Sequence, residues 1–148
     1  MPIRCGQNSA AVKEGAELSC ILRAAGDGFT VDTFLASTSL VAYDVFRRGE
    51  PKTSATQFKT SGINIEVSAT DFNDLEGQVE DAIRFLKSNR EELKRLRRFQ
   101  GVEDVRLDFA VEAKDVFVQS NYLPPELLAL AAELGVGIEL SIYPQSAL

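Results

Sequence analysis

The last quarter of the chain shows two successive patterns of apolar residues. From residue 124 to residue 134 the apolar positions recur at helical spacing, and Pro124 with Pro125 suits the first turn of a helix. Gly135 stands where a left-handed C-cap is expected, so we predict that this helix ends there. Beyond it every second residue is apolar, which predicts a strand with one buried face. The inward positions of that strand are Val136, Ile138, Leu140 and Ile142.

The same alternation predicts four earlier strands, over residues 17–24, 41–46, 63–67 and 105–111. A short helix capped by Thr30 or Asp32 is expected between the first two strands. A long helix is expected after residue 73, because Asn73 and Glu76 have the spacing of a capping box. Ser88 followed by Glu91 repeats that spacing, so we predict a break near residues 88–90 and a second helical piece that ends before Gly101.

The predicted order is strand, helix, strand, strand, long helix, strand, helix, strand. Its first six elements match a ferredoxin-like βαββαβ order, and the last two form an added C-terminal αβ unit. Right-handed crossovers place the helices on one face of the sheet. We therefore predict an α+β two-layer sandwich with a mixed sheet. Residues 16–148 form a single domain, residues 1–15 form a polar leader that we expect to be mobile, and the 47–61 segment is a long irregular loop.

Alternating strands leave one face of the sheet polar. A solvated face is the simpler interpretation, and a binding face is the alternative. The candidate binding residues on this face are Arg23, Glu66, Arg106, Asp108 and Tyr143.

Several fold-forming motifs together resemble a known family. They are the strand Leu18 to Ala24, the Arg48-Gly49-Glu50 turn, the helix from Leu75 to Leu86, and the C-terminal sequence Pro125-Glu126-Leu127-Leu128 followed by Leu134-Gly135 and Ile138 to Tyr143. Over about residues 16–144 the chain resembles the bacterial domain of unknown function 4279. The resemblance implies a fold, and it brings no activity and no catalytic residues.

Net charge argues against nucleic acid as a partner, since the chain of 148 residues carries a formal charge of −6. No run approaches the ~20 apolar residues of a membrane span, and the first residues lack a signal sequence, so we expect a cytoplasmic protein. The two cysteines, Cys5 and Cys20, do not form a disulfide framework, and we expect Cys20 to be a buried apolar side chain.

Catalytic chemistry has few candidates in this sequence. The chain has no histidine, which excludes Ser-His-Asp, Cys-His and histidine-metal sites. Carboxylate pairs such as Asp71 with Asp74, or Asp104 with Asp108, are more simply interpreted as surface acids. The sequence after Asp71 begins like a calcium loop but lacks the required later ligands. We therefore expect no metal, no cofactor and no enzymatic activity.

Positive charge gathers in one segment. Residues 84–98 contain seven basic and two acidic side chains, a net charge of +5. Cations late in a helix match the helix dipole, and the spacings of Glu80 with Arg84 and Glu91 with Arg95 suit ion pairs, so a solvated helix is the simpler interpretation. As a binding surface, this basic helix end would consist of Arg90, Lys94, Arg97 and Arg98.

These observations favour a non-catalytic protein-interaction module, with an immunity or inhibitor role as an extension and a protein partner of unknown identity. A second copy of the chain, forming a homodimer, is an alternative partner. The alternative is a small-molecule-binding domain or a carboxylate-dependent hydrolase that uses a cleft beside the 47–61 loop. A ligand site should be a concave pocket with converging polar groups, whereas an interaction module should present a flat or ridged patch.

Overall fold

The computed structural model describes residues 17–147, so the predicted leader of residues 1–15, with Cys5, lies outside the described part. The strands and helices follow the order that the sequence predicts. In chain order they are β1 (Cys20–Gly26), α1 (Val31–Leu35), β2 (Ala42–Phe46), β3 (Ser61–Ser68), α2 (Leu75–Ser88), α3 (Arg90–Arg98), β4 (Asp104–Glu112), α4 (Pro125–Leu134), β5 (Gly137–Tyr143) and the 3₁₀ turn η1 (Gln145–Ala147).

The five strands form one mixed sheet in the order β2-β3-β1-β4-β5. Neighbouring strands are antiparallel, except that β5 runs parallel to β4. This parallel pair is joined by the crossover that contains α4, because parallel neighbours cannot be connected by a tight turn. β1 lies at the centre, where Leu22 faces Ile65 of β3 on one side and Leu107 of β4 on the other. The prediction of an α+β domain with a mixed sheet is confirmed.

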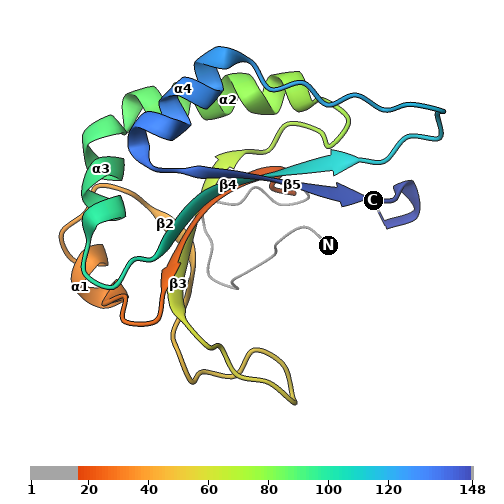
Figure 1. Ribbon diagram of the computed structural model, residues 1–148. Coiled ribbons are helices and arrows are strands. Elements are labelled where there is room, and N and C mark those ends of the chain that lie inside the picture. Colours follow the sequence, from red (N-terminus) through yellow and green to blue (C-terminus); the bar gives the residue numbers. More distant parts are fainter. Residues whose placement is uncertain (1–16, 148) are drawn as a thin grey trace.

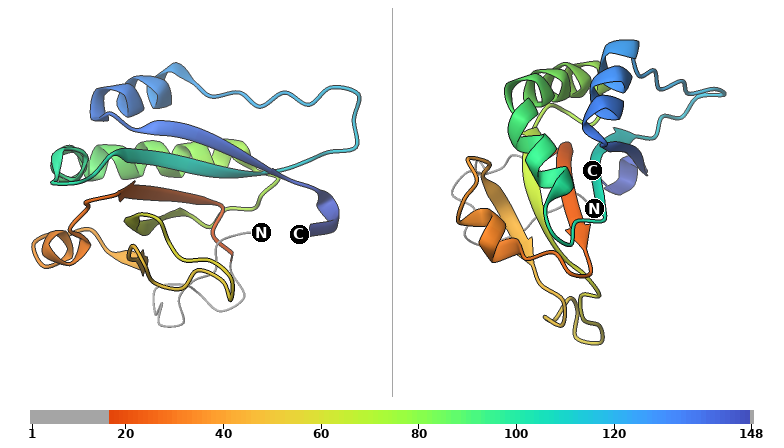
Figure 2. Two further views of the ribbon diagram at one scale, coloured as in Figure 1. Left: turned by 60° about the horizontal axis from the view of Figure 1, so that its bottom comes forward. Right: turned by 60° about the vertical axis from the view of Figure 1, so that its left-hand side comes forward.

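Helices α2, α3 and α4 lie over one face of the sheet (Figures 1 and 2). Between this layer and the sheet lies one continuous apolar core, to which α1 adds Phe34 beside Phe99, with ring centroids 5.0 Å apart. Its fully buried members include Leu22, Ala24, Ile63, Leu86, Leu96, Leu107, Phe109 and Leu127. The alternating strand residues therefore do supply the core from one face only.

Helix α4 begins and ends where its sequence predicts. Pro124 is the N-cap and Pro125 the first helical residue, while Gly135 adopts the left-handed conformation with φ of 71°. The Val136 N–H then donates to the Ala131 carbonyl at 2.8 Å, which satisfies a carbonyl at the helix end. The predicted stop at Gly135 is confirmed, and it turns the chain directly into β5.

Capping predictions for the long helix are wrong by one residue. Asp74, not Asn73, is the N-cap of α2, and its Oδ1 accepts from the Gly77 N–H at 2.9 Å. The predicted break near residues 88–90 is confirmed, and Asn89, not Ser88, is the residue before α3; its side-chain amide donates to the Phe85 carbonyl. Asp and Asn are as effective as Ser at these positions, so the backbone path decides between neighbouring candidates.

Inward-facing predictions fail at the margins of the sheet. Val41 is exposed, and a bulge between Ala42 and Asp44 turns Tyr43 away from the main core. Leu140 is half-buried and Ile142 is exposed, since β5 is an edge strand. Alternation along a strand assigns a face, but only the covering helix decides how deeply that face is buried.

Two adjacent leucines of α4 provide a test of the core. Leu127 is fully buried, whereas Leu128 is 46% exposed. Leu127→Ala should lower the free energy of unfolding by about 2 to 5 kcal/mol, because it leaves a cavity, and Leu128→Ala should cost less than about 1 kcal/mol. Urea unfolding of both variants measures the difference, and equal losses would contradict the orientation of α4.

Candidate functional site

The polar face predicted as a candidate site is the face of the sheet without helices. On it, Arg23 of β1 lies directly opposite Asn64 of β3 and Arg106 of β4. Asp108 follows two residues further along β4, opposite Glu139 of β5. Four predicted residues thus share this surface and interact electrostatically. We call these four residues the central polar patch. It consists of Arg23, Arg106, Asp108 and Tyr143.

Both arginines of the central polar patch are held by hydrogen bonds. Arg23 Nε donates to Asn64 Oδ1 at 3.0 Å, and Asn64 Nδ2 donates in turn to Asp44 Oδ2 at 3.0 Å. Arg106 donates from Nε to Asp104 Oδ2 at 2.6 Å and from Nη1 to Glu139 Oε1 at 3.2 Å. Such charge-assisted bonds fix the plane of each guanidinium group.

Asp108 is the partly buried acid of the patch. Ser141 Oγ donates to its Oδ1 at 2.6 Å. Burial raises the pKa of Asp108, and the hydrogen bond from Ser141 opposes that shift without cancelling it. Burial also raises the pKa of Tyr143, and the nearby Asp108 carboxylate adds to the effect, so the phenol keeps its proton at neutral pH.

Parts of this face are less polar and less exposed than the sequence suggests. The alternation of the strands places Ser19 and Asn64 on the solvent-exposed face, but both side chains are buried. Ile21 and Tyr43 form a small apolar cluster with Leu18, apart from the main core. The alternation along the first strand places Leu18 on the core face, so its position differs from the prediction. Glu66, the fifth predicted residue, lies on β3 opposite Ile21 of β1, and the apolar Ile21 stands between it and Asp108 of the patch.

The predicted basic helix end is largely used inside the domain. Arg90 Nη1 contacts Glu133 Oε2 at 2.5 Å, and Arg97 Nε donates to the Gly135 carbonyl at 3.1 Å. Lys94 lies 3.5 Å from Glu91, while Arg98 is exposed at the end of α3. The helix pairs are spaced by three residues, as in Asp81 with Arg84 and Glu92 with Arg95, and not by the predicted four. This segment therefore fastens α3 to α4 and to the start of β5.

The hollow beside the 47–61 loop is formed by that loop. Short pairings, such as Gly49 N–H to the Phe58 carbonyl, fold the loop back on itself. The hollow has a volume of about 820 Å³, and residues between Arg48 and Lys59 line it. No sheet residue contributes to its lining, so the expected cleft between loop and sheet takes a different form.

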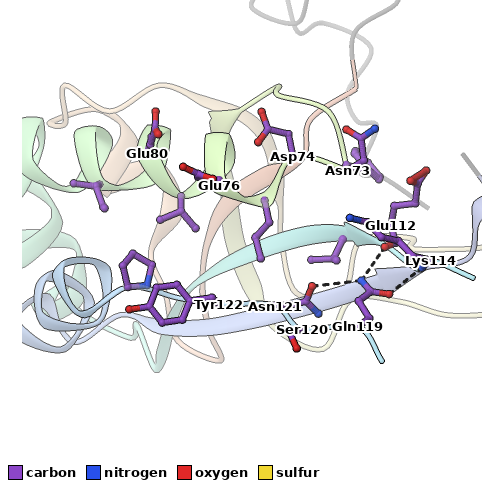
Figure 3. A pocket seen from close by; sticks show the side chains of 16 residues that line it. Asn73, Asp74, Glu76, Glu80, Glu112, Lys114, Gln119, Ser120, Asn121 and Tyr122 are labelled. Carbon is purple, nitrogen blue, oxygen red and sulfur yellow. Dashed lines mark hydrogen bonds between the residues drawn. The ribbon is translucent and has the colours of Figure 1, made fainter. Parts of the chain in front are cut away.

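A cleft that sequence reasoning missed lies between α2 and the segment that leads into α4. Its volume is about 630 Å³. Figure 3 shows Glu80, Glu76 and Asp74 along α2, with Gln119 and Asn121 on the facing segment. The cleft is lined by Phe72, Asn73, Asp74, Leu75, Glu76, Val79, Glu80, Ile83, Val111, Glu112, Lys114, Gln119, Ser120, Asn121, Tyr122 and Pro124.

Gln119 holds the outer wall of the cleft in place. Its Nε2 donates to the Glu112 carbonyl at 3.0 Å, and its Oε1 accepts from the Lys114 N–H at 2.9 Å. The sequence predicts a short extended piece over residues 116–119, but this segment is irregular and exposes Phe117 completely. The sequence Gln119-Ser120-Asn121 has no periodic pattern of apolar residues, so the outer wall of the cleft could not be predicted from the sequence.

Three further titratable groups, Cys20, Asp104 and Asp74, have structural roles. Cys20 is a buried free thiol, and burial raises its pKa well above the usual value, which confirms its expected role as a core side chain. Asp104 pairs with Arg106 and Asp74 caps α2. Within residues 17–147 no group of three or more His, Cys, Asp or Glu side chains is arranged to hold a metal ion. No helix in the same range is long and apolar enough to cross a membrane.

Fold and surfaces together define a small α+β domain with helices on one sheet face and a polar patch on the other. The model of the family described as domain of unknown function (DUF4279) matches residues 16–145, and the chain belongs to that family. Searches of curated proteins and of solved structures found no match.

Asp108 offers a test of the patch through the pH dependence of stability. A carboxyl group whose pKa is higher in the folded state binds its proton more tightly there, so its ionisation destabilises the fold as pH rises above the unfolded value of about 4. Asp108→Asn removes this ionisation and keeps an oxygen for Ser141. The stability of Asp108→Asn relative to wild type should therefore increase with pH above about 4 and level off above the folded pKa.

Urea unfolding of both proteins at a series of pH values measures this difference. Ser141→Ala is the companion variant, because losing its hydrogen bond should raise the pKa of Asp108 further and widen the pH range of the effect. A difference between Asp108→Asn and wild type that falls with rising pH would contradict the direction of the shift.

Proposed function

We propose that this domain is a non-catalytic module that binds another protein through the central polar patch. The observation that carries the proposal is the fixed orientation of Arg23 and Arg106 on adjacent strands at the centre of the sheet. Arginine and tyrosine are enriched among binding hot spots, and side chains held in place before binding lose less entropy when a partner arrives.

The surroundings of the patch support a protein partner over a small molecule. Neither the hollow in the 47–61 loop nor the cleft beside α2 is lined by Arg23, Arg106 or Asp108. A partner with a flat surface and both signs of charge would complement alternating arginines and carboxylates. An immunity or inhibitor role in the cytoplasm of a bacterium extends this proposal, since such a domain acts by occupying the surface of another protein.

For the architecture, we propose a ferredoxin-like βαββαβ unit with an added αβ unit. The antiparallel order β2-β3-β1-β4, with α1 and the α2–α3 pair as its two helices, supports the first part. The attachment of β5 parallel to β4 through α4 supports the second. In this arrangement the added strand supplies Glu139 and Tyr143, so the extra unit widens the proposed binding face.

Arg106 is the residue on which to test this function. Tagged protein captures partners from extracts of its own cells, and the partner is then purified so that its dissociation constant can be measured. Arg106→Gln should weaken binding by about 30-fold, the equivalent of a hot spot of about 2 kcal/mol. Glutamine is preferable to glutamate here, because a third carboxylate beside Asp104 and Glu139 would itself destabilise the strand.

Arg84→Gln is the matched control, since Arg84 lies on α2 at the other side of the domain and its side chain is 69% exposed. It should leave the dissociation constant unchanged. Arg98→Gln tests the basic helix end, and a loss of binding in that variant alone would move the interface to α3. If the purified partner is a second copy of the chain, sedimentation of wild type and Arg106→Gln should show the dimer dissociating only in the variant.

A further inference from the structure

The cleft between α2 and residues 119–124 has an apolar floor. Leu75, Val79 and Ile83 come from successive turns of α2, and Val111 comes from the end of β4. Val79 and Val111 are buried, whereas Leu75 and Ile83 are half-buried and remain accessible. At about 630 Å³ the cleft falls in the range of small-molecule sites, which combine apolar walls with a few polar groups.

The rim of the cleft is acidic, and most of its charge is uncompensated. Glu76, Glu80 and Glu112 belong to none of the ion pairs found within residues 17–147. Their helix neighbour Asp81 is paired with Arg84, and Asp74 is engaged by the Gly77 N–H. Lys114 is the one basic residue in the lining. The rim therefore carries a net negative charge next to apolar surface.

The facing wall adds groups that accept hydrogen bonds or contact cations. Asn121 Oδ1 accepts only a long hydrogen bond, at 3.4 Å from Gln119 Nε2, and can accept from a ligand as well. Tyr122 is 73% exposed at the edge of the cleft. A phenol ring in such a position can contact a cation through its face.

We propose that this cleft binds a small organic cation, an ammonium or guanidinium group carried on an apolar body. The apolar body lies on Leu75, Val79 and Ile83, and the charged group lies at the rim close to Glu76. The Glu80 carboxylate, which is directed away from Asn121 in Figure 3, adds to the negative charge of that rim. An organic anion of the same size is disfavoured by the carboxylates around the rim. Although the N-terminus of α2 would favour an anion, Asp74 already occupies it.

This site and the central polar patch share no residue, although Phe72 of the cleft contacts Tyr143 of the patch, with ring centroids 5.6 Å apart. Its lining comes from α2, the end of β4 and the segment before α4, and it includes none of the four patch residues. The two proposals can therefore fail independently. A variant of the cleft should leave partner binding by Arg106 unchanged, and Arg106→Gln should leave ligand binding in the cleft unchanged.

The test uses a pair of probes with the same apolar body and opposite charges, 4-phenylbutylammonium and 4-phenylbutyrate. Each is titrated into the full ¹⁵N-labelled chain, and amide chemical shifts are followed. The ammonium probe should give saturable shifts at residues 75–83 and 119–122, with a dissociation constant at least about tenfold below that of the carboxylate probe. Its affinity should fall as salt is added, because exposed charges are screened.

The variant Glu76→Gln/Glu80→Gln should weaken the ammonium probe by about fivefold to tenfold, as expected for two exposed ion pairs lost together, and leave the carboxylate probe unchanged or slightly tighter. Glu91→Gln is the matched control, since its side chain is 86% exposed on α3, away from the cleft lining, and it should change neither affinity. Both glutamates lie on the exposed side of α2, so the double variant should fold normally.

Two results would overturn the proposal. One is equal affinity of the two probes, which would show that the acidic rim does not select charge. The other is the absence of saturable shifts with 4-phenylbutylammonium while a short peptide of alternating lysine and leucine residues saturates the same amides, which would make the cleft a peptide-docking groove. Diaminobutane, which has charge without a large apolar body, should bind more weakly than the aromatic amine if the floor contributes as proposed.

Discussion

The whole structure depends on burying one face of a five-stranded sheet. Leu22, Leu107 and Phe109 point to that face from the two central strands, and each is completely buried by the helix layer. Because side chains alternate along a strand, burying these residues necessarily turns Arg23, Arg106 and Asp108 to the other side. The polar patch is thus a direct consequence of how the core is made, and its position does not depend on any loop.

Much of this arrangement could be predicted from the sequence, because long strands and helices repeat their signal many times. β4 alternates from Asp104 to Phe109, and α4 is bounded by two prolines and a glycine, so both were located correctly. Errors occurred where a single residue decides. Asp74 replaced Asn73 as a cap, and a bulge turned Tyr43 away from the main core. Neither choice leaves a periodic trace, since both depend on the surrounding tertiary structure.

The candidate sites differ in the same way. Alternation identified Arg23, Arg106 and Asp108 as residues of one face, but it could not show that β1 lies next to β4, which is what brings the two arginines together. The cleft was beyond sequence reasoning altogether. It combines a helix, the end of a strand and the irregular wall around Gln119 and Asn121, and only the β4–α4 crossover brings these parts together.

Several basic residues of α2 and α3 contact α4 or the residue that follows it. α3 uses Arg90 and Arg97 to bind Glu133 and the Gly135 carbonyl, and Lys87 of α2 binds Glu126. These contacts hold the cations of α2 and α3 along α4, from Glu126 in its first turn to Glu133 near its end, and on the Gly135 carbonyl beyond it. Glu76 and Glu80, in the first two turns of α2, belong to none of the ion pairs within residues 17–147. The contacts that attach α4 to α2 and α3 therefore use the basic residues near it, and the carboxylates at the rim of the cleft take no part in that pairing.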